Sequence, residues 1–86
     1  MVEKDILVRI ENGLHARPAA QFIKKIIPFQ SKVVFALGSK KINAKSILNL
    51  MGVSILEGQT IRVIVEGEDE IKTLECIESF FRGQND

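Results

Sequence analysis

Apolar residues recur along the chain in two different periods, which predict both strands and helices. Ile6, Val8 and Ile10 alternate with other positions, a period of two that is typical of a strand with one face on a core. The next apolar residues recur at helical spacing, and we expect a helix over about residues 16–27 that Pro28 ends. The expected apolar face of this helix comprises Ala19, Phe22, Ile23, Ile26 and Ile27.

A hairpin is expected after Pro28. Residues 33–37 alternate again between core-type and other positions, and the pair Gly38-Ser39 leads into a short segment at residues 40–43. Short loops that contain glycine commonly join antiparallel strands. The pattern therefore predicts two paired strands.

The rest of the chain predicts a short helix, a strand and a longer helix. A dense apolar cluster follows Ser46, whose hydroxyl is placed to cap a helix. The alternation at residues 61–65 predicts a strand that ends at Gly67. The acidic residues 68–70 lie where a helix start favours negative charge, and helical spacing continues until Gly83. The expected buried face of this last helix comprises Ile71, Leu74, Ile77 and Phe81.

The predicted order is strand, helix, strand, strand, helix, strand, helix (βαββαβα). Each strand pattern has one apolar face, so two layers are the economical arrangement. We therefore expect an α+β fold, a two-layer open-faced β-sandwich with a four-stranded antiparallel sheet and three helices on one face. The second face would meet water, which suits the charged residues Lys32, Arg62 and Glu66 better than it suits Val34 and Ile64.

Length and composition indicate one small globular domain spanning residues 1–86. Apolar residues make up 45% and charged residues 27%, a balance found in globular rather than disordered or membrane proteins. No apolar run reaches bilayer length and no secretory signal is present, so we expect no membrane insertion and a cytoplasmic location. The lone Cys76 allows no intramolecular disulfide and is expected to pack in the core.

The formal net charge of +1 hides an asymmetry. Residues 1–45 carry nine Lys or Arg and three acids, whereas residues 46–86 carry three and eight. A basic patch of this size would attract an acidic or phosphorylated partner, and it is too small to require nucleic acid. Without Tyr or Trp, a sheet-based nucleic-acid binder would also lack most of its stacking groups, so no nucleic-acid partner is expected.

His15 is the only histidine, and it lies at a predicted helix start. The first turn of a helix leaves backbone N–H groups unpaired and carries partial positive charge, which suits phosphate. The same positive end disfavours a charged imidazole, so we expect a neutral ring that can attack phosphorus. Arg17 offers a planar set of donors for phosphate oxygens. The spacing alone fits a capping or surface histidine, with Arg17 as a solvated charge, equally well.

Metal binding and a catalytic triad find no support in the sequence. One histidine, one distant cysteine and no clustered carboxylates cannot supply the several ligands that zinc needs. We therefore expect no metal.

The segment Asn12 to Ala20, NGLHARPAA, resembles the active-site segment of the HPr family, the histidine-containing phosphocarriers of the bacterial sugar phosphotransferase system. Residues 44–46 resemble the second signature of the family and residues 67–70 its turn before the last helix, so the resemblance covers the whole chain. It implies that His15 accepts a phosphoryl group on Nδ1 from phosphorylated enzyme I and passes it to the IIA domains of sugar permeases. Arg17 would bind the phosphate. The protein would then be a monomeric, stoichiometric carrier rather than an enzyme, without a cofactor.

Ser46 has two compatible interpretations. Its hydroxyl can cap the short helix, which would stabilise the fold by about 1 kcal/mol. The resemblance adds regulatory phosphorylation, because many HPr relatives carry a phosphoserine at the matching position, and an HPr kinase/phosphorylase would then be a further partner. A phosphate at a helix start is not expected to melt the helix, so its effect would fall on docking. Asn49 and Leu48 depart from the glycine and methionine that regulated relatives often have.

More apolar residues follow Ser46 than one buried stripe can use. We expect some of them to form an exposed partner-binding patch, and the alternative is that they close a small core. The resemblance favours docking, because relatives use this helix and the first helix to meet enzyme I and IIA. The expected docking residues are Ala20, Lys24, Ile47, Leu48 and Met51, with Lys24, Lys45 and Arg17 as a basic rim.

A second hypothesis keeps the fold and changes the role. Under it, the protein is a regulatory binding protein that is controlled at Ser46 and acts on transcription factors or enzymes. The presence of His15 argues against a purely regulatory form. Labelling of His15 by enzyme I or of Ser46 by an ATP-dependent kinase would separate the two hypotheses.

Overall fold

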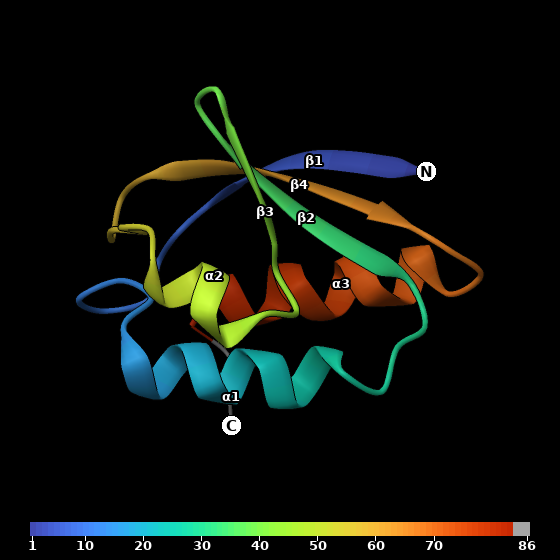
Figure 1. The fold of residues 1–86 in the computed structure, drawn as a ribbon, viewed down its shortest axis with the longest axis horizontal. Coiled ribbons are helices and arrows are strands. Elements are labelled where there is room, and N and C mark those ends of the chain that lie inside the picture. Colours follow the sequence, from blue (N-terminus) through green and yellow to red (C-terminus); the bar gives the residue numbers. More distant parts are fainter. Residues whose placement is uncertain (84–86) are drawn as a thin grey trace.

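The computed structural model describes residues 1–83, which form four strands and three helices (Figure 1). No helix in this part of the chain is both long and apolar enough to cross a membrane. In chain order the elements are β1 (Val2–Leu7), α1 (Ala16–Ile26), β2 (Lys32–Leu37), β3 (Lys40–Asn43), α2 (Ile47–Met51), β4 (Thr60–Glu66) and α3 (Glu70–Phe81).

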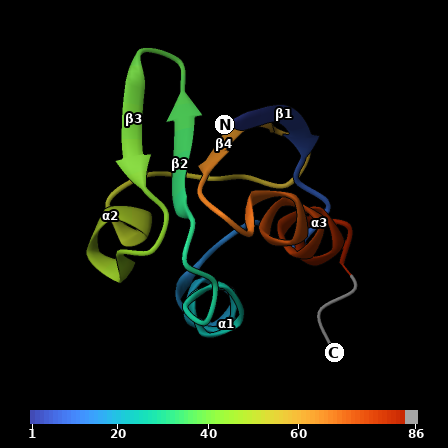
Figure 2. The ribbon, with the colours of Figure 1, turned by 90° about the vertical axis from the view of Figure 1, so that its right-hand side faces the viewer.

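The strands form one antiparallel sheet in the order β1-β4-β2-β3. Ile6 of β1 lies opposite Ile61 of β4, and Phe35 of β2 lies opposite Ile42 of β3, so the predicted hairpin is confirmed. The three helices lie on one side of the sheet (Figure 2). The predicted two-layer open-faced sandwich is therefore confirmed.

The outer face of the sheet combines ion pairs with a half-buried apolar pair. Arg62 Nη1 lies 3.0 Å from Glu3 Oε1, and Arg62 Nε lies 3.2 Å from Asp5 Oδ1. Val34 and Ile64, which fitted a wet face poorly, are cross-strand partners, and both are half-buried. Each shields part of the other from water, which lowers the cost of their place on this face.

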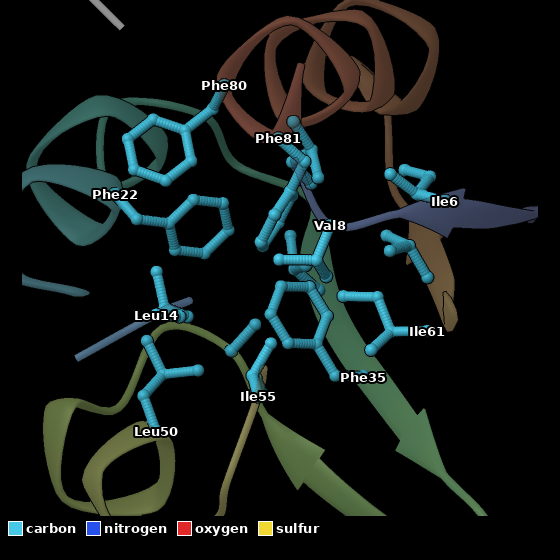
Figure 3. Close-up of a cluster of buried hydrophobic side chains, with 14 of the residues drawn as sticks. Ile6, Val8, Leu14, Phe22, Phe35, Leu50, Ile55, Ile61, Phe80 and Phe81 are labelled. Atoms are coloured by element: carbon cyan, nitrogen blue, oxygen red, sulfur yellow. The ribbon is translucent and has the colours of Figure 1, made fainter. Parts of the chain in front are cut away.

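Phenylalanine rings form the centre of the core between the two layers (Figure 3). The ring centroid of Phe22 in α1 lies 5.5 Å from that of Phe35 in β2 and 5.2 Å from that of Phe80 in α3. Tilted pairs at this separation add to the stabilisation from burial itself. Phe22 therefore connects α1, which begins next to His15, to the sheet and to α3.

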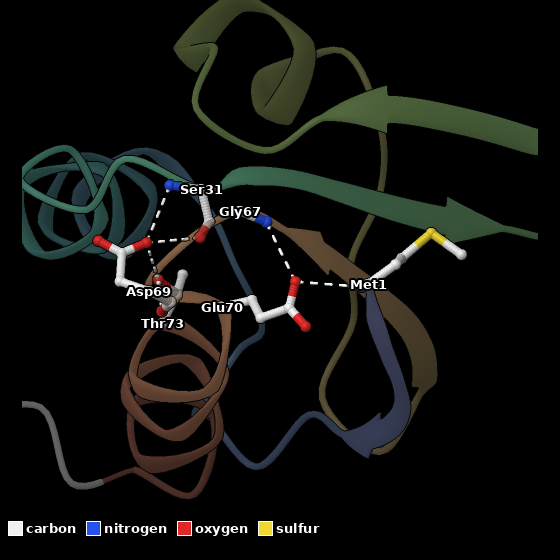
Figure 4. A network of polar contacts seen from close by, with 6 residues as sticks. All are labelled: Met1, Ser31, Gly67, Asp69, Glu70 and Thr73. Carbon is white, nitrogen blue, oxygen red and sulfur yellow. Dashed lines mark hydrogen bonds and ion pairs between the residues drawn. The ribbon is translucent and has the colours of Figure 1, made fainter.

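A carboxylate network joins the start of α3 to the segment before β2 (Figure 4). Asp69 accepts hydrogen bonds from the Ser31 hydroxyl, from the Gln30 N–H at 2.9 Å and from the Ser31 N–H at 3.0 Å. The Ser31 hydroxyl, followed by the Gln30 N–H, lowers the pKa of Asp69 from 3.8 to about 2, because these bonds favour the charged form. The Gly67 N–H donates to Glu70 at 3.1 Å and likewise lowers the pKa of Glu70.

The predicted first strand extended too far along the chain. β1 ends before Val8, although Val8 and Ile10 are buried as the alternation predicted. The Val8 N–H still donates to the Gln59 carbonyl at 2.8 Å, whereas the Arg9 N–H donates to the Phe81 carbonyl at 2.9 Å. The chain therefore leaves the sheet here and packs against the end of α3.

Three side chains are more exposed than their pattern predicted. Ile27 follows the last residue of α1 and is 55% exposed, and Ile71 in the first turn of α3 is 57% exposed. Cys76 is half-buried rather than a core residue, and its burial raises the pKa of its thiol. Ile77 and Phe81 of α3 are buried as predicted, Leu74 is partly buried, and Thr73 and Phe80 are buried as well.

Candidate functional site

His15 lies at the start of α1, as predicted. Its backbone is extended (φ −99°, ψ −167°), and its carbonyl accepts a hydrogen bond from the Ala19 N–H at 2.8 Å. The imidazole is exposed and makes no capping hydrogen bond, so the side chain does not serve as the helix cap. The N–H groups of the first helical turn and the positive end of the helix dipole therefore remain available to an anion.

A contact between two loops fixes the backbone ahead of His15. The Leu14 N–H donates to the Ile55 carbonyl oxygen at 2.9 Å. Gly13 has a positive φ of 77°, and a β-carbon at this position would collide with the Ile55 carbonyl oxygen. Only glycine allows both this backbone conformation and this approach, so the loop arrangement sets where His15 begins the helix.

A depression of about 240 Å³ opens beside the imidazole. Asn12, at its edge, has a φ of 67°, and its N–H donates to Glu57 Oε1 at 3.2 Å. The polar residues of the lining are Asn12, His15 and Ser54. The other lining residues come from the loop before α1, from α2 and from the segment after it, and they are Leu14, Leu50, Met51, Val53, Ile55 and Leu56.

Arg17 lies in the first turn of α1, two residues after His15, and its side chain is exposed. It forms no ion pair with any residue that the structure describes. Its guanidinium donors are therefore free to meet a phosphate oxygen. Pro18 follows in the same turn and is buried; it fixes the backbone angle where no N–H donor is needed.

Ser46 is the N-cap residue of α2, which confirms the predicted cap. Its Oγ accepts hydrogen bonds from the Asn49 N–H at 3.2 Å and from the Asn49 side-chain amide at 2.9 Å. The side-chain amide of Asn49 thus adds a second bond to the cap, which a glycine at this position could not make.

The apolar residues of α2 are exposed as expected. Ile47 is 41%, Leu48 is 82% and Met51 is 49% exposed, whereas Leu50 between them is fully buried. The alternative that these three exposed side chains close the core is therefore wrong. They form a surface that we call the α2 patch, made of Ile47, Leu48 and Met51.

The α2 patch lies on a helix that contacts α1. Ala20 and Lys24 are exposed on α1, as the docking prediction requires, and Met51 lines the same depression as His15. Lys45 is different: it is half-buried, and its Nζ donates to the Phe29 carbonyl at 2.6 Å. This bond ties Lys45 to the loop after α1. Of the predicted rim residues, Arg17 and Lys24 are the two whose charges have no partner within residues 1–83.

The sequence did not predict the contribution of the segment between α2 and β4, residues 52–59, to this site. We call residues 8–15, between β1 and α1, the histidine loop. Ser54 lines the depression, and Ile55 and Glu57 accept hydrogen bonds from this loop, but all three are far from it in the sequence. Hydrophobic periodicity reports local structure and carries no signal for such a contact. The Asn12-Gly13 pair was the single local hint, because a required glycine often marks a close backbone approach.

The PTS-HPr family, described as "PTS HPr component phosphorylation site", matches residues 2–83. The chain belongs to the HPr family. HPr-like protein Crh of Halalkalibacterium halodurans is 44% identical over 80 residues, which are 93% of this chain and 95% of the relative. Phosphocarrier protein HPr of Haemophilus influenzae is 37% identical over 75 residues, 87% of this chain and 88% of the relative.

Solved HPr structures have the same fold. HPr-C-His of Thermoanaerobacter tengcongensis has a TM-score of 0.91 at 32% identity, over 98% of this chain and 94% of that one. Crh of Bacillus subtilis, described as a catabolite repression protein that forms a domain-swapped dimer, has a TM-score of 0.78 at 38% identity, over 98% and 97%. Membership of this family supports a phosphocarrier role in the phosphotransferase system.

Proposed function

We propose that His15 accepts a phosphoryl group from phosphorylated enzyme I and passes it to the IIA domains of sugar permeases. The observation that carries the proposal is the exposed imidazole at the start of α1, which leaves the N–H groups of the first turn unused. In the first transfer, the lone pair of a ring nitrogen attacks phosphorus and the bond to enzyme I breaks. In the second, the bond between nitrogen and phosphorus breaks as the IIA acceptor attacks.

The helix start and Arg17 stabilise the transferred group. Phosphoryl transfer spreads negative charge over three oxygens, so catalysis depends on donors that are already in place. The unpaired N–H groups of α1 supply fixed donors, and the exposed Arg17 guanidinium supplies a mobile positive charge. The protein is thus a stoichiometric carrier that needs no cofactor, rather than an enzyme.

The α2 patch, with Ala20 and Lys24 of α1, is the proposed docking surface for enzyme I and IIA. A partner must bring the side chain that donates or accepts the phosphoryl group to His15, so its interface has to surround the depression. Exposed apolar side chains next to such a point are typical of an interface centre, and Lys24 and Arg17 add attraction for acidic partners. The protein then acts as a cytoplasmic monomer that meets each partner in turn.

Incubation with phosphoenolpyruvate and enzyme I tests the proposal. The wild-type protein should gain one phosphoryl group that is labile in acid and stable in base, as a phosphohistidine is. His15→Ala should gain none, and Arg17→Ala should be labelled about tenfold more slowly, since one charged donor is lost. Labelling of His15→Ala at the wild-type level would overturn the proposal.

A second candidate function is regulation through phosphorylation of Ser46. It is favoured by the 44% identity with HPr-like protein Crh, which exceeds the 37% identity with the phosphocarrier of Haemophilus influenzae. Phosphate on Ser46 would place negative charge beside the α2 patch and would not oppose the helix dipole. Its effect would therefore fall on partner choice.

HPr kinase/phosphorylase with ATP separates the two functions. Labelling of Ser46 that is lost in Ser46→Ala, together with no labelling of His15 by enzyme I, would favour regulation over carriage. Sedimentation analysis adds the state of assembly, because the carrier proposal expects a monomer, whereas Crh of Bacillus subtilis is described as a swapped dimer.

A further inference from the structure

The depression beside His15 has a divided lining. Six of its lining residues are apolar, and three, Asn12, His15 and Ser54, are polar. A phosphoryl group on the imidazole brings strong acceptor oxygens and about two negative charges to this region. An oxygen turned toward the apolar wall would lose water without gaining a donor, which is unfavourable. The polar lining residues therefore decide how such a group is held.

Ser54 is the polar lining residue that the fold itself does not explain. Asn12 has a positive φ of 67°, which asparagine tolerates better than most residues, so its identity has a structural reason. The Ser54 side chain is exposed, and its hydroxyl has no hydrogen-bond partner among residues 1–83. The hydroxyl is therefore an uncommitted donor at the edge of the depression.

The backbone that follows Ser54 holds it in a fixed relation to His15. The next residue, Ile55, is 2% exposed, and its carbonyl oxygen accepts the Leu14 N–H at 2.9 Å. One residue further, the Leu56 N–H donates to the Gln59 side chain at 3.0 Å. The segment that carries Ser54 is thus anchored directly to the residue that precedes the histidine.

We propose that Ser54 is a second phosphoryl-binding residue, whose hydroxyl donates a hydrogen bond to an oxygen of the phosphoryl group on His15. This inference rests on the proposed phosphorylation of His15, and it adds a donor from outside the helix start. A hydroxyl that donates to a charged oxygen makes a stronger bond than one that donates to a neutral acceptor. Ser54 would therefore stabilise the phosphorylated form relative to the free imidazole.

The effect should be visible in hydrolysis of the phosphohistidine. In this reaction water attacks phosphorus, the bond to the ring nitrogen breaks, inorganic phosphate leaves and the nitrogen is left with its lone pair. In hydrolysis, unlike transfer from enzyme I, the donor already binds the group in the starting state. A loose, metaphosphate-like transition state carries less negative charge on the three oxygens than the starting dianion, so the donor stabilises the starting state more and slows the reaction. Loss of the Ser54 hydroxyl should speed hydrolysis about three- to tenfold. This is the range of an ordinary hydrogen bond and lies below that of a shielded bond to a charged group, because the site is open to water.

The experiment loads His15 chemically, with phosphoramidate, which transfers its phosphoryl group to imidazole and releases ammonia. Loss of the phosphohistidine is then followed at neutral pH by ³¹P NMR in the wild type, Ser54→Ala, Ser54→Thr and Ser39→Ala. Ser54→Ala should hydrolyse three- to tenfold faster, whereas Ser54→Thr, which keeps the hydroxyl, should match the wild type. Ser39→Ala is the matched control, because Ser39 is also exposed and without a partner among residues 1–83 but lies in the β2–β3 turn.

The outcomes separate this inference from the proposed function. Equal hydrolysis rates in Ser54→Ala and the wild type overturn the inference. If transfer from enzyme I to Ser54→Ala is slower while hydrolysis is unchanged, Ser54 contributes to docking and not to phosphoryl binding. If phosphoramidate loads His15 and enzyme I does not, the carrier proposal fails while the hydrolysis rates still decide the role of Ser54. If neither reagent phosphorylates His15, both proposals fail.

Discussion

The backbone N–H of Leu14 donates to the carbonyl oxygen of Ile55 at 2.9 Å, and this bond joins the histidine loop to the segment after α2. The proposed acceptor and the α2 patch are therefore parts of one connected unit. A partner that binds α2 would contact a helix whose following segment, through Ile55, is hydrogen-bonded to Leu14, the residue before His15. The position of the imidazole should accordingly depend on this contact between loops.

Gly13→Ala tests that dependence. Alanine at a φ of 77° costs about 1–2 kcal/mol, and its β-carbon would also collide with the Ile55 carbonyl, so we expect a loss of about 2–4 kcal/mol in the free energy of unfolding. Gly38→Ala is the control, because Gly38 has a similar φ of 64° with nothing near a β-carbon. It should lose about 1–2 kcal/mol. Urea unfolding measures the free energy of unfolding of both variants. Equal losses in Gly13→Ala and Gly38→Ala would contradict a collision at Gly13.

Ser46→Ala should lower stability through the cap of α2. Ser46 Oγ accepts two hydrogen bonds from Asn49, and removal of such a cap costs about 1 kcal/mol. Ser39→Ala, which removes an exposed hydroxyl from a turn, should change the free energy of unfolding by less than about 0.5 kcal/mol. Urea unfolding at pH 7 compares them, and an unchanged Ser46→Ala would mean that the cap contributes nothing.

Leu48→Ser tests the α2 patch as a docking surface. Leu48 is 82% exposed, so the substitution should leave stability within about 0.5 kcal/mol of the wild type. If Leu48 lies at an interface centre, the KM for this protein as a substrate of enzyme I should rise about tenfold. Ile71→Ser, at a 57% exposed position on α3, should leave that KM unchanged. Equal effects of the two substitutions would remove the reason to place docking on α2.

Asp69 should make stability depend on pH in acid. Its pKa is about 2 in the folded state and about 3.8 when unfolded, so the unfolded state takes up the proton first. The stabilisation is complete above about pH 4 and is lost as the pH falls toward 2. Thermal unfolding between pH 2 and 5 should show the midpoint of the wild type falling in this window.

Asp69→Asn provides the comparison for this pH effect. It should have a lower midpoint at pH 7, because a neutral amide is a weaker acceptor for the Ser31 and Gln30 donors, and a flatter response between pH 4 and 2. Glu68→Gln, at a neighbouring exposed position with no partner in residues 1–83, should keep the wild-type response. An unchanged slope in Asp69→Asn would assign the acid sensitivity to other carboxylates.

The sequence predicted the sandwich well because each layer leaves a local pattern. Alternation predicted β2 and β4, the Gly38-Ser39 turn predicted β3 as the second arm of a hairpin, and helical spacing with Pro28 predicted α1 to within one residue. The pattern was wrong for residues that are buried without belonging to a strand. Val8 and Ile10 are buried as predicted, yet the Arg9 N–H bonds to the end of α3, and periodicity cannot register that change of partner.

The same reasoning explains what could be predicted of the site. His15 and Arg17 are local to one helix start, where elementary rules for N–H groups and dipoles apply. Asp69 also lies at a helix start, but its carboxylate bonds to Gln30 and Ser31, far away in the sequence. For Ile71, the sequence predicted a contact that the structure does not make. Helical spacing assigned Ile71 to the buried face of α3, but its side chain is exposed. Tertiary contacts decide these cases, and single-chain patterns do not encode them.

A phosphoryl chase through His15 tests the central claim most directly. Protein labelled with ³²P by enzyme I and phosphoenolpyruvate is freed of both and mixed with an excess of an unphosphorylated IIA domain. The label should move from this protein to IIA, and preparations of His15→Ala should carry none to move. Label that remains on the protein, or that enters and leaves His15→Ala as it does the wild type, would contradict the account.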